Sequence, residues 1–258
     1  MVIIMKFLKE RRIKKSLSDE VFGRNIVYMP VCDSTNEVAK RKKDMPHGTM
    51  FIADLQTKGK GRLGRSWEAE KKSSICMSIL IKDDTPVSDS PIITLAAGIA
   101  VCRALGENTK IKWPNDIVIG TKKVCGILTE RSGDAMICGI GINVNTKEFS
   151  PELADKATSI FLETGEKQDI DYVCALVLNE FELVYNILRE GGFAALYEEY
   201  ESLCITVDKE VVILKDGEEI PGVALGITPN GELIVDTAEG TIPVSSGEVS
   251  VRGIYGYI

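Results

Sequence analysis

The stretch best suited to binding an anion is residues 56–67, where glycines alternate with cations. Its glycines allow backbone N–H groups to turn toward a bound anion. Arg62 and Arg65 can each form two hydrogen bonds to a carboxylate or a phosphate. A solvated basic loop between two strands explains the same composition equally well, so this stretch alone predicts an anion site only weakly.

A second group of polar residues surrounds a proline in residues 110–116. Pro114 cannot take part in regular strand pairing, so the chain should kink there and present side chains to a cavity. Lys112, Asn115 and Asp116 supply an ammonium, an amide and a carboxylate, which phosphate and magnesium would require. On composition alone, a surface β-turn is the better explanation.

Two further stretches place unusual residues in apolar strands. Lys123 stands shortly before Gly126 in a strand, where a lysine is usually an edge residue that extends to solvent. Residues 139–145 alternate glycine with isoleucine and then asparagine. Glycines in a strand allow a ligand or another backbone to approach closely, although core packing explains them too.

These stretches need elements that hold them in place, and periodicity predicts an α+β chain. Strands are expected at residues 26–31, 49–55, 74–81, 110–113, 117–119, 123–129 and 135–144. Helices are expected at residues 36–43, 90–105, 171–190 and 193–203. From residue 207 the chain alternates short β runs with turns, which predicts a small antiparallel barrel or sandwich. We therefore expect a short basic arm (residues 1–25), a mixed-sheet domain with packed helices (26–206) and a small β domain (207–258).

Composition excludes several classes of function. The only histidine, His47, lies in a turn, so chemistry that depends on a histidine base or a histidine-rich metal site is excluded. The seven cysteines have no metal-ligand spacing and lie mostly in apolar runs, as in a reducing, cytoplasmic compartment. No apolar stretch is long enough to cross a bilayer, and the first ten residues lack the positive-then-apolar order expected of a signal peptide.

Charge argues against general nucleic-acid binding. The net charge is −7, and residues 207–258 carry nine acids against three bases. Two basic clusters, in residues 6–15 and 58–72, stand out against this background. The cluster in residues 6–15 is best explained as the solvated face of a helix.

In order along the chain, these stretches closely resemble the biotin–protein ligase family. The resemblance begins at Asp33-Ser34-Thr35-Asn36 and extends through the loop 56–67, the Lys-Trp-Pro-Asn-Asp run and the Lys-Val-Cys-Gly-Ile-Leu run to residues 139–143. It spans residues 26 to about 145, and the C-terminal part resembles the family's SH3-like domain more loosely. The conjunction of these motifs in this order is specific, although each is weak alone.

The resemblance implies a role for each matching position. The residues implied to bind biotin are Ser34, Thr35, Asn36, Gln56, Lys60, Gly61, Arg62, Trp67, Lys123 and Gly126. Those implied to bind ATP are Arg62, Arg65, Lys112, Asn115, Asp116 and Asn143. Arg62, Lys112 and Lys123 are the implied catalytic residues, and Mg²⁺ would be held mainly by substrate phosphates, with Asp116 as a candidate ligand.

Two features of the sequence depart from the family pattern. Lys60 stands where the family often has arginine, which keeps the charge but loses the two-pronged hydrogen bonding. Bifunctional members also carry an N-terminal winged helix-turn-helix of about 60 residues. Only 25 residues precede the expected catalytic domain here, so we expect a monofunctional enzyme without repressor activity or specific DNA binding.

The resemblance implies a two-step reaction in the cytoplasm. Biotin would react with ATP to give biotinyl-5′-AMP, which would then acylate a lysine of a biotin carboxyl carrier protein domain. The oligomeric state is left open, and a homodimer is compatible with the sequence. Two alternatives are a lipoate–protein ligase, which shares the fold and the chemistry, and a non-enzymatic DNA-binding regulator that senses biotin.

Overall fold

The structure is a computed structural model. It describes residues 2–18, 21–82, 90–215, 217–246 and 250–253.

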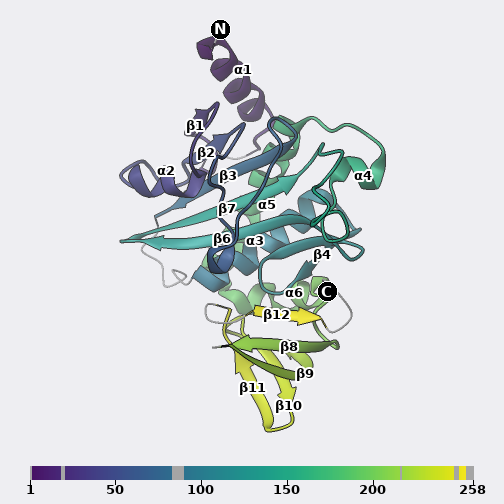
Figure 1. Ribbon diagram of the computed structural model, residues 1–258. Helices are drawn as coiled ribbons and strands as arrows, with labels where there is room; N and C mark the ends of the chain where they lie inside the picture. Colours follow the sequence, from purple (N-terminus) through teal and green to yellow (C-terminus); the bar gives the residue numbers. More distant parts are fainter. Residues whose placement is uncertain (1, 19–20, 83–89, 216, 247–249, 254–258) are drawn as a thin grey trace.

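A seven-stranded mixed sheet forms the centre of the molecule (Figure 1). Its strands lie in the order β1-β2-β3-β7-β6-β5-β4. Their bounds are β1 Ile26–Met29, β2 Met50–Ala53, β3 Ser74–Ile81, β4 Thr109–Lys112, β5 Asp116–Ile119, β6 Lys122–Ser132 and β7 Ala135–Asn143. Only the β1–β2 pair is parallel among these neighbours, and the others are antiparallel.

Helices cover both faces of the sheet. Alternate residues of a strand point to opposite faces, and the apolar ones accordingly divide into two clusters. Phe51 and Leu80 pack with α2 (Thr35–Arg41) on one face. The neighbouring residues of the same strands pack on the other face with α3 (Ser90–Leu105) and α5 (Ile170–Gly191).

The helix α5 follows the amphipathic pattern expected for residues 171–190. Asp169 caps its N-terminus, because its carboxylate accepts hydrogen bonds from the N–H groups of Asp171 and Tyr172. Gly192, with φ of 65°, follows its last residue. The remaining helices are α1 (Val2–Lys15), α4 (Ile160–Thr164), α6 (Tyr197–Leu203) and the 3₁₀ turns η1 (Arg62–Gly64) and η2 (Phe193–Leu196).

The N-terminal helix α1 is anchored to the body of the protein. The Ile13 side chain is fully buried in the main core, and Lys9 Nζ lies 2.8 Å from Asp54 Oδ1. Arg12 pairs with Asp169, the residue that caps α5. The basic segment expected from the sequence is thus a helix packed on the domain, at the end of the molecule away from the C-terminal sheet (Figure 1).

The C-terminal part forms a separate five-stranded antiparallel sheet. Its strands are β8 Glu210–Lys215, β9 Glu218–Ile227, β10 Leu233–Thr237, β11 Gly240–Val244 and β12 Ser250–Gly253. They lie in the order β11-β10-β9-β8-β12. This sheet contacts the larger domain where Trp113 Nε1 donates to the Gly231 carbonyl oxygen at 3.1 Å.

The predicted fold class is confirmed: a mixed sheet with packed helices, followed by a small antiparallel β domain. The domain boundary at residues 206–207 remains our proposal. It lies between the end of α6 at Leu203 and the start of β8 at Glu210. Among the described residues, no helix has the length and apolar character needed to span a membrane.

Candidate active site

The candidate site lies on the face of the sheet that carries α2. Residues directly opposite each other on neighbouring strands point to the same face. One such row includes, on five neighbouring strands, Cys76, Gly141, Gly126, Asp116 and Lys112. Gly141 and Gly126, near the middle of this row, have no side chains, so the surface of the sheet forms a trough there. Asp116 and Lys112 lie at one end of the trough.

The glycines of this trough are needed for close packing. A Cβ atom at Gly141 would lie 2.4 Å from the Trp67 ring, and one at Gly139 would lie 2.3 Å from Asn36 Oδ1. Both distances are shorter than any normal contact. The Trp67 indole therefore rests directly on β7, and Asn36 seats on the same strand.

One end of the trough is lined by neutral polar side chains. Gln56 Oε1 accepts hydrogen bonds from Thr35 N at 2.7 Å and from Thr35 Oγ1 at 3.0 Å. Ser34 is the N-cap residue of α2, but its side chain makes no capping hydrogen bond. Its hydroxyl therefore remains available to a ligand, although the residue is buried.

Both the nitrogen and the oxygen of the Asn36 side-chain amide form hydrogen bonds within the protein. Its Nδ2 donates to the Leu128 carbonyl oxygen at 3.2 Å and to Glu130 Oε2 at 2.8 Å. Its Oδ1 lies 2.6 Å from the hydroxyl of Ser78, a fully buried residue of β3. Sequence analysis assigned no role to Ser78.

The other end of the trough is charged. Lys123 Nζ lies 2.6 Å from Asp116 Oδ1, and Asn115 Nδ2 donates to the same oxygen at 3.1 Å. Lys112 lies opposite Asp116 in the β4–β5 hairpin and is buried. Lys123 Nζ also lies 5.5 Å from the Trp67 ring centroid, within the range of a cation–π contact.

The basic loop closes over this end. The Gly61 N–H donates to the Arg65 carbonyl oxygen at 2.7 Å, so the loop folds back on itself. A Cβ at Gly59 would lie 2.3 Å from the Trp67 carbonyl oxygen, so the turn requires glycine there. Lys60 Nζ, the lysine in place of the common arginine, lies 2.6 Å from Glu37 Oε1 on α2.

Arg62 joins three parts of the molecule. Its guanidinium donates to Asn115 Oδ1 at 3.1 Å and to the Ser246 carbonyl oxygen of the C-terminal domain. Burial lowers the pKa of Arg62 from its ordinary value, and nearby Asp116 opposes that effect. Because desolvation disfavours the cation, an anion bound beside Arg62 would be stabilised.

These features surround one cavity of about 770 Å³. Every residue that sequence analysis assigned to a site lines it: Ser34, Thr35, Asn36, Gln56, Lys60, Gly61, Arg62, Arg65, Trp67, Lys112, Asn115, Asp116, Lys123, Gly126 and Asn143. The structure brings these side chains together, while their individual roles remain predictions. The Asn143 amide donates to the Thr158 carbonyl oxygen at 3.1 Å.

One wall of the cavity was not anticipated. Residues 149–157 contribute Phe149, Ser150, Glu152, Leu153, Lys156 and Ala157 to the lining. This segment is tied to the lysine end of the trough, because Lys123 N donates to the Lys156 carbonyl oxygen at 2.9 Å. It has no regular periodicity that would have indicated its position.

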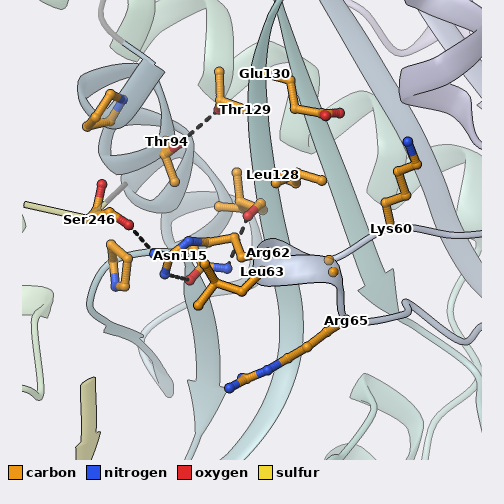
Figure 2. A pocket seen from close by; sticks show the side chains of 15 residues that line it. Lys60, Arg62, Leu63, Arg65, Thr94, Asn115, Leu128, Thr129, Glu130 and Ser246 are labelled. Carbon is orange, nitrogen blue, oxygen red and sulfur yellow. Dashed lines mark hydrogen bonds between the residues drawn. The ribbon is translucent and has the colours of Figure 1, made fainter. Parts of the chain in front are cut away.

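A second cavity of about 490 Å³ shares the basic loop with the first. Figure 2 shows Arg62 with its hydrogen bonds to Asn115 and Ser246, and Lys60 and Arg65 on either side of the loop. Thr94 and Thr129 lie in the same view, joined by a hydrogen bond of 2.8 Å. The basic loop therefore contributes to the lining of both cavities.

Comparison with known proteins identifies the class. Residues 28–146 match the Biotin/lipoate A/B protein ligase family, and residues 206–252 match the Biotin protein ligase C terminal domain.

Particular relatives narrow this class. The chain is 36% identical to the bifunctional ligase/repressor BirA of Bacillus spizizenii, over 95% of this chain and 79% of that protein. It is 31% identical to the biotin–[acetyl-CoA-carboxylase] ligase of Mycobacterium tuberculosis, over 78% of each. The biotin protein ligase of Aquifex aeolicus, solved with biotin and ATP, superimposes with a TM-score of 0.81 at 33% identity, over 89% of this chain and 99% of that one. The chain belongs to the biotin protein ligase family.

Proposed function

We propose that this protein activates biotin with ATP to form biotinyl-5′-AMP and transfers the biotinyl group to a lysine of a biotin carboxyl carrier protein domain. The observation that carries the proposal is the trough itself, which has neutral polar groups at one end and cations at the other. From β3 to β5 there are three interstrand spacings, about 14 Å in all. An elongated ligand with a neutral polar head and an anionic tail fits this arrangement, and biotin is such a ligand.

The neutral end suits the ureido ring. Ser34, Thr35 and Gln56 provide hydroxyl and amide groups in a buried setting, where hydrogen bonds to a urea discriminate strongly against ligands that lack them. Trp67 lies flat on the glycine strand beside this space. It provides an apolar surface for the rings of the ligand.

The cationic end suits two anions that must react with each other. A carboxylate oxygen of biotin attacks the α-phosphorus of ATP, and the bond to the β-phosphate oxygen breaks to release pyrophosphate. Lys123 would hold the biotin carboxylate, and Lys112 and Arg62 would offset the charge that builds on the α-phosphate. Catalysis is then mainly positioning and charge neutralisation.

Transfer needs no covalent enzyme intermediate. The neutral amine of the carrier lysine attacks the acyl carbon of the adenylate, the bond from that carbon to the phosphate oxygen breaks, and AMP leaves. The amine nitrogen loses its proton to solvent or to a nearby base. Closure of the basic loop over the cavity would keep the adenylate from hydrolysis until the carrier arrives.

The donor set fits Mg²⁺ that arrives on the nucleotide. No group of three or more histidine, cysteine or acidic side chains that could hold a metal ion is found among the described residues. Asp116 lies at the cationic end and would be the protein carboxylate nearest the phosphates. The ion would neutralise phosphate charge there.

The location and partners are part of the same proposal. All seven cysteines are free, and six are buried, which suits a reducing cytoplasm. Among macromolecular partners we expect the carrier domain and no specific DNA target, since the net charge is −7. A gel-shift measurement on random duplex DNA tests the second expectation.

The function is tested by incubating the protein with biotin, ATP and Mg²⁺ and detecting biotinyl-5′-AMP by mass spectrometry. Addition of a carrier domain should then produce a mass increase on one lysine. Lipoate in place of biotin is the control, since a lipoate–protein ligase would activate it instead. Absence of adenylate with biotin would overturn the proposal.

A further inference from the structure

A buried serine lies behind the neutral end of the trough. Ser78 is fully buried in β3, in a strand that is otherwise mostly apolar. Its Oγ is 2.7 Å from Thr35 Oγ1 and 2.6 Å from Asn36 Oδ1. Ser78 thus contacts two residues that line the cavity, from the side away from the ligand space.

The orientation of the Asn36 amide is fixed by its partners. Nδ2 faces two acceptors, the Leu128 carbonyl oxygen and Glu130 Oε2, so Oδ1 must be the atom that faces Ser78. Gly139, directly opposite Ser78 on β7, leaves the space that Oδ1 occupies. An amide oxygen can only accept, so the short contact calls for the Ser78 proton.

The hydroxyl groups of Ser78 and Thr35 make more close contacts with oxygen atoms than they have protons to donate. Three close oxygen pairs occur: Ser78 with Asn36, Ser78 with Thr35 at 2.7 Å, and Thr35 Oγ1 with Gln56 Oε1 at 3.0 Å. The Gln56 atom is its oxygen, because it also accepts from Thr35 N at 2.7 Å. The Ser78 and Thr35 hydroxyls together supply only two protons for these three contacts. In one of the contacts, therefore, two oxygens always face each other with no proton between them. A ligand that donates an N–H to this group would relieve the mismatch.

We propose that Ser78 is a positioning residue for ligand recognition: acting through Thr35 and Asn36, it keeps this end of the trough rich in acceptors and so selects a ligand head that bears N–H donors. This inference rests on the proposed function, in which that head is the ureido ring of biotin. Ser78 itself does not touch the ligand. Its effect should therefore appear in biotin affinity and not in ATP affinity.

The test compares Ser78→Ala with Ser74→Ala. Ser74 is a buried serine of the same strand, but its hydroxyl lies 3.2 Å from Thr146 Oγ1 instead. Calorimetry without ATP should show biotin binding weakened about 5- to 100-fold in Ser78→Ala, because a buried hydrogen-bonding group loses its partner. Ser74→Ala should bind biotin as the unaltered protein does, and ATP affinity should be unchanged in both.

A second pair of variants distinguishes the effect of the Ser78 hydroxyl on biotin binding from the effect of side-chain volume. Ser78→Thr and Ser78→Val add the same bulk at the same place, but only threonine keeps the hydroxyl. Tighter biotin binding by Ser78→Thr than by Ser78→Val supports the proposal and keeps it testable if Ser78→Ala folds poorly. Equal binding by the two overturns it.

A double-mutant cycle tests whether Ser78 acts through Thr35. In a Thr35→Val background, Ser78→Ala should cost much less biotin affinity than it does alone, because the shared contact is already gone. Full additivity overturns the proposal, as does an equal loss of biotin and ATP affinity in Ser78→Ala. If the unaltered protein does not bind biotin, the proposed function fails as well, whereas biotin binding that is indifferent to Ser78 overturns this inference alone.

Discussion

Lys123 and Asp116 form an ion pair of 2.6 Å between adjacent strands at the charged end of the trough. Both side chains are largely buried. Lys123 is also the residue that we expect to hold the biotin carboxylate. This lysine therefore has a carboxylate partner within the protein, and biotin must compete with Asp116 for it.

Asp116→Asn should therefore tighten biotin binding when ATP is absent. The gain should be a few-fold, on the order of 1 kcal/mol or less, because the competing pair is only partly shielded from water. Adenylate formation should slow in the same variant, since Asp116 is placed at the nucleotide end. Calorimetry and single-turnover kinetics measure the two effects, with the exposed Asp134→Asn as the control for charge. Unchanged or weaker biotin binding would contradict the competition.

Lys123→Ala and Lys112→Ala should differ in the step that they affect. An interaction that exists before reaction appears in substrate affinity, whereas one that strengthens in the transition state appears in the chemical step. Lys123→Ala should weaken biotin binding without ATP, while Lys112→Ala should bind biotin nearly normally and form adenylate slowly. Exchanged phenotypes would show that our division of roles between these lysines is wrong.

Arg62→Ala should lose adenylate formation or release the adenylate prematurely, with the fold retained. Removal of a charge-assisted contact to a developing anion should cost about 2–4 kcal/mol in the transition state. Arg62 also hydrogen-bonds Asn115 and the Ser246 carbonyl oxygen, so the loop should close less well. Rapid-quench kinetics and free adenylate in solution are the measurements. Turnover at the unaltered rate would exclude this role.

Ile13→Ala should destabilise the catalytic domain even though no described residue of α1 lines the cavity. Ile13 is fully buried in the main core, and removal of such a side chain typically costs about 2–5 kcal/mol. Urea unfolding measures the change, with Lys14→Ala on the exposed side of α1 as the control. Equal stability of the two variants would contradict a structural role for the buried Ile13 side chain.

Asp33 should make stability depend on pH in the acid range. Two hydrogen bonds of 2.8 Å from Arg41, and a third from Ser34 N, hold the pKa of the Asp33 carboxyl well below its ordinary value. A lowered folded-state pKa stabilises the protein fully above the unfolded-state pKa of about 3.9, and this contribution decreases as pH falls from there through the lowered folded-state pKa. Asp33→Asn should therefore be less stable than the unaltered protein at pH 7, and the difference between the two should be smaller at pH 3. Urea unfolding at both pH values tests this, with the exposed Asp44→Asn as the control, and a difference independent of pH would refute it.

The sequence predicted the strands and helices that frame the site because their signals are local. The strand at residues 74–81 and the helix at residues 90–105 were predicted with the bounds that the structure shows. The resemblance to the family also selected cavity-lining residues, since those side chains occur in recognisable runs.

Features that depend on long-range contact were not predictable. Ser78 falls in the strand predicted at residues 74–81, but its place behind the site follows from pairing with Gly139 on a strand about 60 residues away in sequence. The contact from Arg62 to Ser246 joins two domains, and no local pattern indicates it. The lysine in place of the usual arginine was visible in the sequence, but its partner Glu37 was not.

The protein contains two tryptophans, and each lies where two parts of the molecule meet. Trp67 belongs to the loop that closes over the trough, and Trp113 hydrogen-bonds the C-terminal domain through Gly231. Intrinsic fluorescence should therefore report loop closure and domain contact at once. In Trp67→Phe the remaining emission would come from the domain junction alone, so changes at the basic loop and at the domain junction can be followed separately without an added dye.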